Sequence, residues 1–366
     1  MKFTIERNAL LKPLQQVAGV VERRQTLPVL SNLLMTVKDN KLSMIGTDLE
    51  VEMQTHALLV DAEDGQLTIP ARKFLDICRA LPDQADINLS VKDGRAVIRS
   101  GKSRFVLSTL PAADFPNIEI NDALVTFSIS QSALRSAIER SHFAMAQQDV
   151  RYYLNGMLFE ITSGKLTLVA TDGHRLAVCE TSEPVKYDGN QQVIIPRKGV
   201  MELMKLMTDD DQSIEVAVGT NFVRFSTTTT TFISKLIDGR FPDYHNVVPK
   251  QTNKTALCDR ETLRQALSRA SILSNEKYRG VRMMFADGVL RILAHNPEQE
   301  EAEEEVGIEF RGENIEIGFN VNYIVDAVGA GTSEQIRLSL TDSNSCCLIE
   351  GIGEDDCQYV VMPMRL

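Results

Sequence analysis

The chain has 366 residues, of which 43% are hydrophobic, and its formal net charge is −11 at pH 7. This length allows two or three domains with a core in each, and no uncharged apolar run reaches the roughly 18 residues of a membrane-spanning helix. The amino-terminal segment also lacks the apolar stretch of a secretory signal, so we expect a cytoplasmic protein, and the negative charge alone argues against a nucleic-acid partner.

One pattern occurs three times along the chain. The copies align without a gap as SNLLMTVKDNKL-SMIGTD, NGMLFEITSGKL-TLVATD and RGVRMMFADGVL-RILAHN, which start at residues 31, 155 and 279. Each has an apolar run, a short turn rich in Asp, Asn, Gly or Ser, and a second apolar run, which predicts a β-hairpin. The spacing of 124 residues is that of a whole domain and exceeds any solenoid repeat. We therefore predict three tandem copies of one domain, at 1–120, 125–248 and 253–366.

The first copy is predicted to begin with a strand at 1–6 and a helix at 8–24, in which Leu10, Leu14 and Val17 recur at helical spacing. A second helix is predicted at 71–81. The other strands of this copy are expected at 30–37, 42–47, 67–70, 87–91, 95–99 and 103–109.

The second and third copies follow the same plan. In the second, helices are predicted at 131–145, with Ser130 as its N-cap, and at 197–207. Its strands are expected at 126–130, 153–161, 166–171, 193–196, 214–218, 222–227 and 229–236. In the third, helices are expected at 260–273 and 320–330. Its strands are expected at 281–286, 290–294, 316–320, 336–340, 346–352 and 359–364. Runs of sequential strands with two helices per copy predict an α+β fold in which two helices lie side by side on antiparallel sheets.

Few residues suggest catalysis. The six cysteines include no C-x-x-C pair and are expected to be reduced packing residues, the five histidines lack the spacing of a zinc helix, and no phosphate-binding glycine loop occurs. We therefore expect no metal and no cofactor. Asp172 and His174 could orient an imidazole in a hydrolase, but no nucleophile motif accompanies them, and Glu50 takes the place of His174 in the first copy. An enzyme is the less favoured alternative.

Positive charge is concentrated on the predicted helices. Those at 8–24, 71–81, 197–207 and 260–273 each carry a net charge of +2, the one at 131–145 carries +1, and the one at 320–330 carries −1, which leaves −19 for the rest of the chain. For a single helix, a positive net charge is explained equally well by an ordinary solvated face. Because five of the six predicted helices are positive, we infer a basic surface on an otherwise acidic protein. Such a surface attracts phosphates without reading bases. The alternative from another class is a protein-only scaffold whose basic helices merely keep it soluble.

The full length of the chain resembles the bacterial DNA polymerase III β subunit family, the sliding clamps. The resemblance rests on the three tandem copies together with TDGHRLAV (171–178), RFPDY (240–244), SNEKYRGVR (274–282), NPEQEEAEE (296–304) and YVVMPMRL (359–366). It implies a head-to-tail homodimeric ring without enzymatic activity, in which helices line a hole and strands form the outer layer. Double-stranded DNA would pass through the hole, and the ring would act as a processivity factor.

The resemblance also implies three sets of site residues. Those expected to touch DNA are Arg24, Arg72, Lys73, Gln148, Tyr152, Tyr153, Arg197 and Lys198. Those expected at the dimer interface are Lys102, Arg104, Phe105, Leu107, Ile272, Leu273, Glu300, Glu301, Glu303 and Glu304. A cleft for apolar peptides of the polymerase III catalytic subunit, the clamp loader, other polymerases and repair proteins is expected at Arg151, Leu154, Thr171, Gly173, His174, Arg175, Leu176, Pro242, Val247, Tyr323, Val360, Met362, Pro363, Met364 and Arg365. The sequence departs from the family pattern at His245, Asn246, Asn344 and Cys346, which bears on peptide preference at that edge.

Overall fold

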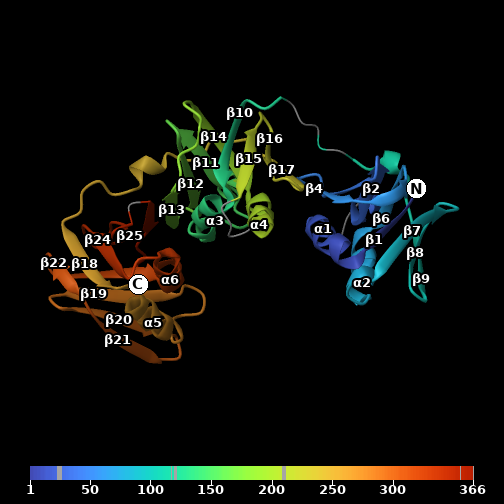
Figure 1. Cartoon of the computed structure of the whole chain (residues 1–366). Coiled ribbons are helices and arrows are strands. Elements are labelled where there is room, and N and C mark those ends of the chain that lie inside the picture. Colours follow the sequence, from blue (N-terminus) through green and yellow to red (C-terminus); the bar gives the residue numbers. More distant parts are fainter. Residues whose placement is uncertain (23–26, 117, 119–121, 208–211, 355, 366) are drawn as a thin grey trace. The chain divides into compact units, whose positions relative to one another are not determined.

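The computed structural model describes residues 1–22, 27–116, 118, 122–207, 212–354 and 356–365. It divides into two compact units, Met1–Gln131 with Met201–Leu236, and Ser132–Val200 with Ile237–Leu366. Figure 1 follows the chain through its labelled elements. Every strand pair described in these units is antiparallel, which confirms the predicted α+β class.

The three predicted hairpins are present, each with a two-residue turn. They are β2 (Asn32–Lys38) with β3 (Lys41–Thr47), β11 (Gly156–Thr162) with β12 (Lys165–Thr171), and β19 (Gly280–Ala286) with β20 (Val289–His295). In the first turn, Asp39 and Asn40 have φ of 50° and 56°. Asp and Asn tolerate this left-handed region better than most residues, so they fit the tight turn that joins twisted strands.

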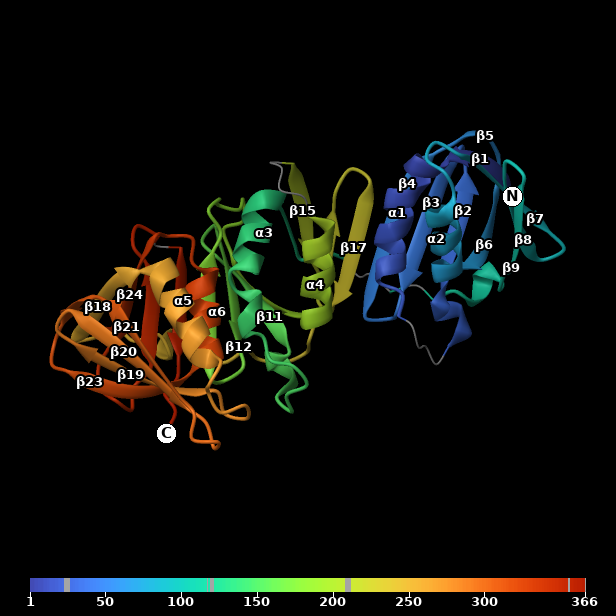
Figure 2. The same ribbon diagram turned by 90° about the horizontal axis from the view of Figure 1, so that it is seen from below.

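The first unit contains an eight-stranded and a five-stranded sheet. The eight-stranded sheet has the order β10 (Val125–Ser130), β15 (Ser213–Val218), β16 (Phe222–Ser226), β17 (Thr230–Lys235), β4 (Val51–Leu58), β3, β2 and β6 (Gly65–Pro70). The five-stranded sheet has the order β5 (Val60–Glu63), β1 (Lys2–Glu6), β7 (Asp86–Lys92), β8 (Arg95–Ser100) and β9 (Ser103–Ser108). Helices α1 (Arg7–Gly19) and α2 (Ala71–Ala80) lie side by side (Figure 2), and α1 packs on β3 and β4.

The second unit contains a nine-stranded and a four-stranded sheet. The larger has the order β14 (Asn190–Pro196), β11, β12, β13 (Arg175–Glu180), β26 (Cys357–Val361), β25 (Cys347–Gly351), β24 (Gln335–Leu340), β18 (Lys254–Asp259) and β22 (Glu309–Arg311). The smaller has the order β21 (Glu301–Gly307), β20, β19 and β23 (Ile315–Asn320). Helices α5 (Arg260–Ser271) and α6 (Val321–Ala330) lie side by side (Figure 2).

The two helices of the third repeat begin at side-chain caps. The Asp259 carboxylate accepts the Thr262 amide at 2.7 Å at the start of α5, and Asn320 accepts the Asn322 amide at 3.0 Å at the start of α6. These bonds satisfy amides that have no partner within the helix. The hydrogen bonds from Thr262 also lower the pKa of Asp259.

Both large sheets cross from one repeat into another, which the sequence did not predict. Strand β17 of the second repeat pairs with β4 of the first, and β13 of the second repeat pairs with β26 of the third. The repeats are therefore joined by continuous backbone hydrogen bonding as well as by the chain that connects them.

Several predicted helix ends are wrong. Helix α1 ends at Gly19 instead of residue 24, and α3 (Gln131–Glu139) ends before residue 145 and is followed by a short 3-10 turn at His142–Ala144. The Ser141 hydroxyl donates to the Ala137 carbonyl at 2.7 Å, and the His142 ring contacts the Glu139 carbonyl, so side chains take carbonyls that a longer helix would use. Helix α4 spans Arg197–Leu206, close to its prediction.

The expectation that all six cysteines are reduced is also wrong. Cys179 and Cys357 form a disulfide, and the other four cysteines are free. Two cysteines far apart in sequence meet here because β13 pairs with β26, a contact that local sequence cannot reveal. Within the described residues, no helix is long and apolar enough to cross a bilayer.

Candidate functional site

A cavity of about 190 Å³ opens over the core of the second unit, between β12, β13 and the segments at 151–154, 241–247 and 360–362. Its floor belongs to a buried cluster that includes Leu176, Phe241, Tyr244 and Val360. Most of the lining side chains are apolar, while Arg151 and Arg175 supply positive charge. An apolar pocket with a few oriented polar groups is the usual form of a ligand site.

The loop between β12 and β13 is held by its own polar side chains. The Asp172 carboxylate accepts the amides of His174 and Arg175 at 2.9 Å and 3.0 Å, and the Thr171 hydroxyl accepts the Gly173 amide at 3.0 Å. Gly173 has a φ of +86°, and a Cβ atom there would lie 2.9 Å from an Arg151 guanidinium nitrogen. The position therefore favours glycine for both its backbone conformation and its close neighbour.

Arg151 is fixed at the rim of the cavity. Its guanidinium donates two hydrogen bonds to Asp149, at 3.0 Å and 2.9 Å, and one to the Asp172 carbonyl at 3.1 Å. The side-chain hydrogen bonds from Arg151 lower the pKa of Asp149 to about 2. Both groups are thus charged at neutral pH, and Arg151 can present its remaining donors to an acidic or carbonyl-rich ligand.

Arg175 connects the cavity wall to helix α6. Its guanidinium donates to Asp172 at 3.1 Å and to Asp326, and it lies over the Tyr323 ring at 4.5 Å from the centroid. His174 stacks on the same tyrosine, with ring centroids 6.2 Å apart. The Asp172 carboxylate is therefore used by backbone amides and by Arg175, and the His174 imidazole rests on an aromatic ring. This arrangement gives no support to a hydrolase built on Asp172 and His174.

Ten of the fifteen residues predicted for the peptide cleft line this cavity. They are Arg151, Leu154, Thr171, Gly173, Arg175, Leu176, Pro242, Val247, Val360 and Met362. The sequence interpretation did not place Tyr153, Phe241 or Tyr244 in the cleft, although all three line it, and Tyr153 was assigned to DNA instead. Phe241 and Tyr244 belong to the RFPDY segment, so its aromatic residues could have signalled their place.

The other predicted cleft residues lie elsewhere in the second unit. His174 and Tyr323 stack on each other, outside the cavity lining. Met364 and Arg365 line a separate cavity of about 460 Å³ with Asn275, Tyr278 and His295. Pro363 lies between Met362 and Met364 in the chain, and thus between residues of the two cavities.

The four residues at which the sequence departs from the family pattern make contacts with nearby side chains and backbone groups. The rings of Tyr244 and His245 lie 4.1 Å apart, and Asn246 donates to the Asp243 carboxylate at 2.7 Å. The Cys346 thiol is half-buried and contacts the Val247 carbonyl at 3.9 Å, and burial raises its pKa. The Asn344 amide donates to the Asp342 carboxylate at 2.8 Å, in the turn before β25.

The residues predicted to touch DNA occur in both units. Arg72 and Lys73 are exposed in the first turn of α2, where Arg72 also donates to the Val21 carbonyl at 3.2 Å. Arg197 and Lys198 are half-buried in the first turn of α4, and burial, together with the charge of Arg175, lowers the pKa of Arg197. Gln148 and Tyr152 are exposed, and Arg24 lies outside the described residues.

The charge on the helices is partly offset by local ion pairs. In α5, Arg264 pairs with Glu261 at 2.6 Å and Arg269 pairs with Glu304 at 2.6 Å, and in α4 Lys205 pairs with Glu202 at 2.7 Å. Helix α3 is shorter than predicted and is formally neutral, with one arginine and one glutamate. The basic surface is therefore weaker than the predicted helix ends suggested.

The predicted interface residues lie at two sheet edges and at the end of α5. In the first unit, Lys102 and Arg104 are exposed and Phe105 and Leu107 are partly exposed at β9, the last strand of the five-stranded sheet. In the second unit, β21 is the edge of the four-stranded sheet. Its glutamates include exposed Glu301 and Glu303, with exposed Glu300 just before the strand and partly buried Glu304. Ile272 at the end of α5 is 75% exposed, and Leu273 is partly exposed.

Comparison with known proteins assigns this fold to a family. Three models of the DNA polymerase III beta subunit match the chain, the N-terminal domain at residues 1–119, the central domain at 128–243 and the C-terminal domain at 245–365. The chain therefore belongs to the DNA polymerase III beta subunit family and consists of three tandem clamp domains.

Individual relatives agree over the whole length. The chain is 55% identical to a protein named beta sliding clamp from Pseudomonas putida, with all of both chains covered. It is 54% identical to the crystal structure of DNA polymerase III subunit beta from Pseudomonas aeruginosa, with full coverage of both chains and a TM-score of 0.98. Another structure of the Pseudomonas aeruginosa protein, bound to griselimycin, has 54% identity, full coverage of both chains and a TM-score of 0.96.

Proposed function

We propose that this protein is a processivity factor for DNA replication, a ring-shaped homodimer that encircles duplex DNA and tethers a polymerase to it. The main support is that all three family domains match the chain, in order and along its whole length. The fold also matches a solved beta subunit with a TM-score of 0.98. Our proposed domain boundaries are 1–120, 125–248 and 253–366. The role needs no catalysis and no cofactor, and it locates the protein with the DNA in the cytoplasm, on the nucleoid.

Ring closure is assigned to the edges β9 and β21 of two copies. An edge strand leaves backbone donors and acceptors unpaired, and two such edges can pair across subunits. The Lys102 and Arg104 side chains at one edge carry positive charge, and Glu300, Glu301 and Glu303 at the other carry negative charge. Because the two surfaces differ, the contact is head-to-tail, and two copies of it close a dimer.

DNA contact is assigned to the basic helix ends and to the segment around residue 148. Arg72, Lys73, Arg197 and Lys198 lie in the first turns of α2 and α4, with Gln148 and Tyr152 as exposed polar and aromatic contacts. Such contacts are weak and independent of base sequence. Weak contact is sufficient because a closed ring is held by its topology, and it leaves the ring free to slide.

The cavity beside Tyr153 and Met362 is assigned to a short apolar peptide of the polymerase III catalytic subunit, the clamp loader, or other polymerases and repair proteins. Its walls bury apolar side chains, worth about 1.5–3 kcal/mol for each one fully removed from water, and Met362 can adapt its shape to different ligands. Arg151 and Arg175 would orient polar or acidic groups of the same peptide.

A primer-extension assay tests the proposal. The cognate replicative polymerase and clamp loader copy a long, primed single-stranded circle with and without this protein, in the presence of excess trap DNA that captures any polymerase that dissociates. We expect products at least about tenfold longer when the protein is present. Equal product lengths would contradict the proposed function.

A further inference from the structure

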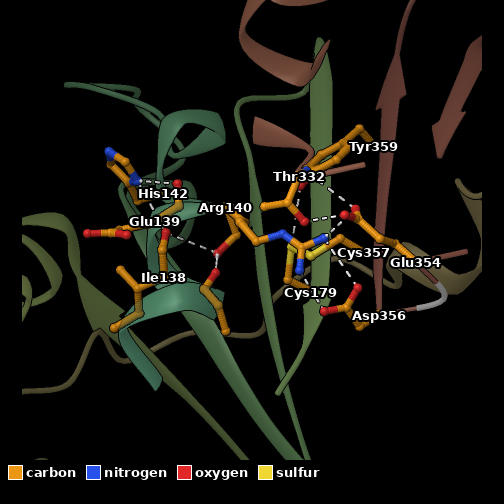
Figure 3. The surroundings of a disulfide bond; sticks show 12 residues. Ile138, Glu139, Arg140, His142, Cys179, Thr332, Glu354, Asp356, Cys357 and Tyr359 are labelled. Atoms are coloured by element: carbon orange, nitrogen blue, oxygen red, sulfur yellow. Dashed lines mark hydrogen bonds and ion pairs between the residues drawn. A yellow bond between two sulfur atoms is a disulfide. The ribbon is translucent and has the colours of Figure 1, made fainter. Parts of the chain in front are cut away.

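Cys179 and Cys357 occupy directly opposed positions on the paired strands β13 and β26, and their sulfurs are bonded (Figure 3). Their Cα atoms are 4.2 Å apart, and the neighbouring Glu180 amide donates to the Asp356 carbonyl at 2.7 Å. The cysteines thus form a non-hydrogen-bonded pair, the type in an antiparallel sheet whose side chains come closest.

The bond joins two family domains. Cys179 lies in the segment that matches the central domain, Cys357 lies in the segment that matches the C-terminal domain, and 178 residues separate them. A covalent link at this point holds the central and C-terminal domains together even when the hydrogen bonds between β13 and β26 open. A long closed loop also restricts the unfolded chain strongly.

Charged groups reinforce the same junction (Figure 3). Arg140, just after α3, donates to Asp356 at 2.6 Å and to Glu354 at 3.1 Å, and Thr332 donates to Glu354. The two bonds from Arg140 tie the central domain to the turn between β25 and β26, and the Thr332 bond holds this turn within the C-terminal domain. The strands can therefore stay paired without the disulfide, so the thiols remain opposed after reduction.

The disulfide faces away from the peptide cleft. Leu176 and Val360 belong to the core beneath the cleft, and each lies three positions from a cysteine on its own strand. Side chains alternate between the two faces of a strand, so the sulfurs lie on the opposite face, where Cys179 Sγ is 3.9 Å from the Tyr359 hydroxyl. Changing the bond should therefore leave the cleft surface in place.

The four free cysteines are poor competitors for exchange. Cys78, Cys258 and Cys347 are buried, and burial raises the pKa of Cys78 and Cys258 to about 12. Burial also raises the pKa of half-buried Cys346. Thiolates are the reacting species, so these side chains react slowly with disulfides.

We propose that Cys179 and Cys357 form a reversible thiol–disulfide modification site, a redox-dependent covalent lock between the central and C-terminal domains. Its reaction partners are small-molecule disulfides and thiols. In the forward direction, one cysteine thiolate attacks a small-molecule disulfide to give a mixed disulfide and one thiolate, and the second cysteine thiolate then displaces the other. Two protein thiols and one small disulfide become one protein disulfide and two small thiols, which carry the two protons. Both cysteine residues are at most 2% exposed, so exchange requires local opening of the strand pair.

Thiol counting on the full-length protein tests the chemistry. The protein is equilibrated with oxidised glutathione or with dithiothreitol, freed of reagent, and titrated under denaturing conditions. We expect four reactive thiols after oxidation and six after reduction. Peptide mapping without reductant should find the peptide of Cys179 linked to that of Cys357. Six thiols in the oxidised sample, or a different linked pair, would overturn the proposal.

Thermal unfolding tests the lock. Reduction should lower the midpoint of the transition that includes the second unit by roughly 5–10 °C, while the affinity for a cleft peptide should change less than about twofold. Cys357→Ala should unfold like the reduced wild type in both redox states, and the control Cys346→Ala should keep the full redox shift. No shift in the wild type, or a shift of the same size in Cys357→Ala, would refute the lock. If Cys357→Ala does not fold, the comparison of oxidised and reduced wild type decides alone.

Discussion

Met362 and Met364 are two residues apart, yet they line different cavities. The family resemblance placed both in the peptide cleft, and only the geometry separates them. Four lining residues, Thr171, Gly173, Arg175 and Leu176, could be named from the motif TDGHRLAV, since that loop and strand β13 form one wall. Tyr153, Phe241 and Tyr244 could not be placed from periodicity, because their position depends on how the 151–154 and 241–247 segments fold over the sheet.

The methionine pair gives a matched test of the cleft. Met362→Ala removes an apolar wall from the cavity and should weaken the binding of an apolar clamp-binding peptide by about tenfold, corresponding to about 1.4 kcal/mol. Met364→Ala should change the affinity less than about twofold. Fluorescence anisotropy of a labelled peptide measures both. Equal losses in the two variants would show that the peptide extends over both cavities.

Glu52 is a buried carboxyl on β4, where the first repeat pairs with the second. It accepts the Ile118 amide at 3.3 Å, and burial raises its pKa above the ordinary value of 4.5. The folded chain therefore holds this proton more tightly than the unfolded chain does. Its contribution to stability is complete below pH 4.5 and is lost as the pH rises through the raised pKa.

Glu52→Gln keeps an oxygen for the Ile118 amide but cannot ionise. We expect the variant to gain stability relative to the wild type as the pH rises from about 4.5 to 8, by about 1 kcal/mol at the upper end. Urea unfolding of both proteins across this range measures the difference. A stability difference that does not change with pH would contradict a raised pKa at Glu52.

At the scale of elements, the hairpins were predictable and the charged edge strand was not. The Asp-Asn, Ser-Gly and Asp-Gly turns between apolar runs define β2–β3, β11–β12 and β19–β20 by local chemistry. Strand β21, with the sequence EAEEEVG, has few apolar residues, and only the inward position of Val306 marks it. It forms because β20 offers a pairing edge, and the side chains of Glu301, Glu303 and Glu305 remain exposed.

The edge strands and the end of α5 also carry a prediction about assembly. Ile272→Ala combined with Leu273→Ala removes exposed apolar surface beside the proposed interface and should shift the protein from dimer towards monomer. Analytical ultracentrifugation over a range of protein concentrations measures this shift. We expect the dissociation constant of the dimer to be at least about tenfold higher than in the wild type.

Leu58→Ala with Val60→Ala provides the matched control. These side chains are 85% and 78% exposed, and Val60 lies on β5, the edge of the five-stranded sheet opposite β9. The control should remain a dimer. An unchanged sedimentation profile for the Ile272 and Leu273 variant, or equal dissociation of the control, would refute the assignment of the interface.

At the scale of the whole molecule, a threefold sequence repeat predicted the domain plan but not the joining of the domains. Pairing of β17 with β4 and of β13 with β26 depends on edges far apart in sequence, so no local pattern signals it. The same pairing brings Cys179 to Cys357, which is why the spacing of the cysteines in the sequence does not reveal their disulfide. The net charge of the chain is likewise a poor guide to its surface. The chain carries −11 as a whole, yet individual helices such as α2 carry a net charge of +2.

We propose that the dimer holds DNA by enclosing it. The clamp loader and ATP are used to load labelled protein onto a nicked circular duplex, and the complex is passed over a sizing column at a salt concentration that suppresses phosphate contacts. We expect the protein to stay with the circle and to be released once a restriction enzyme makes the same DNA linear. Equal retention on circular and linear DNA, or no retention on the circle with an active loader, would contradict it.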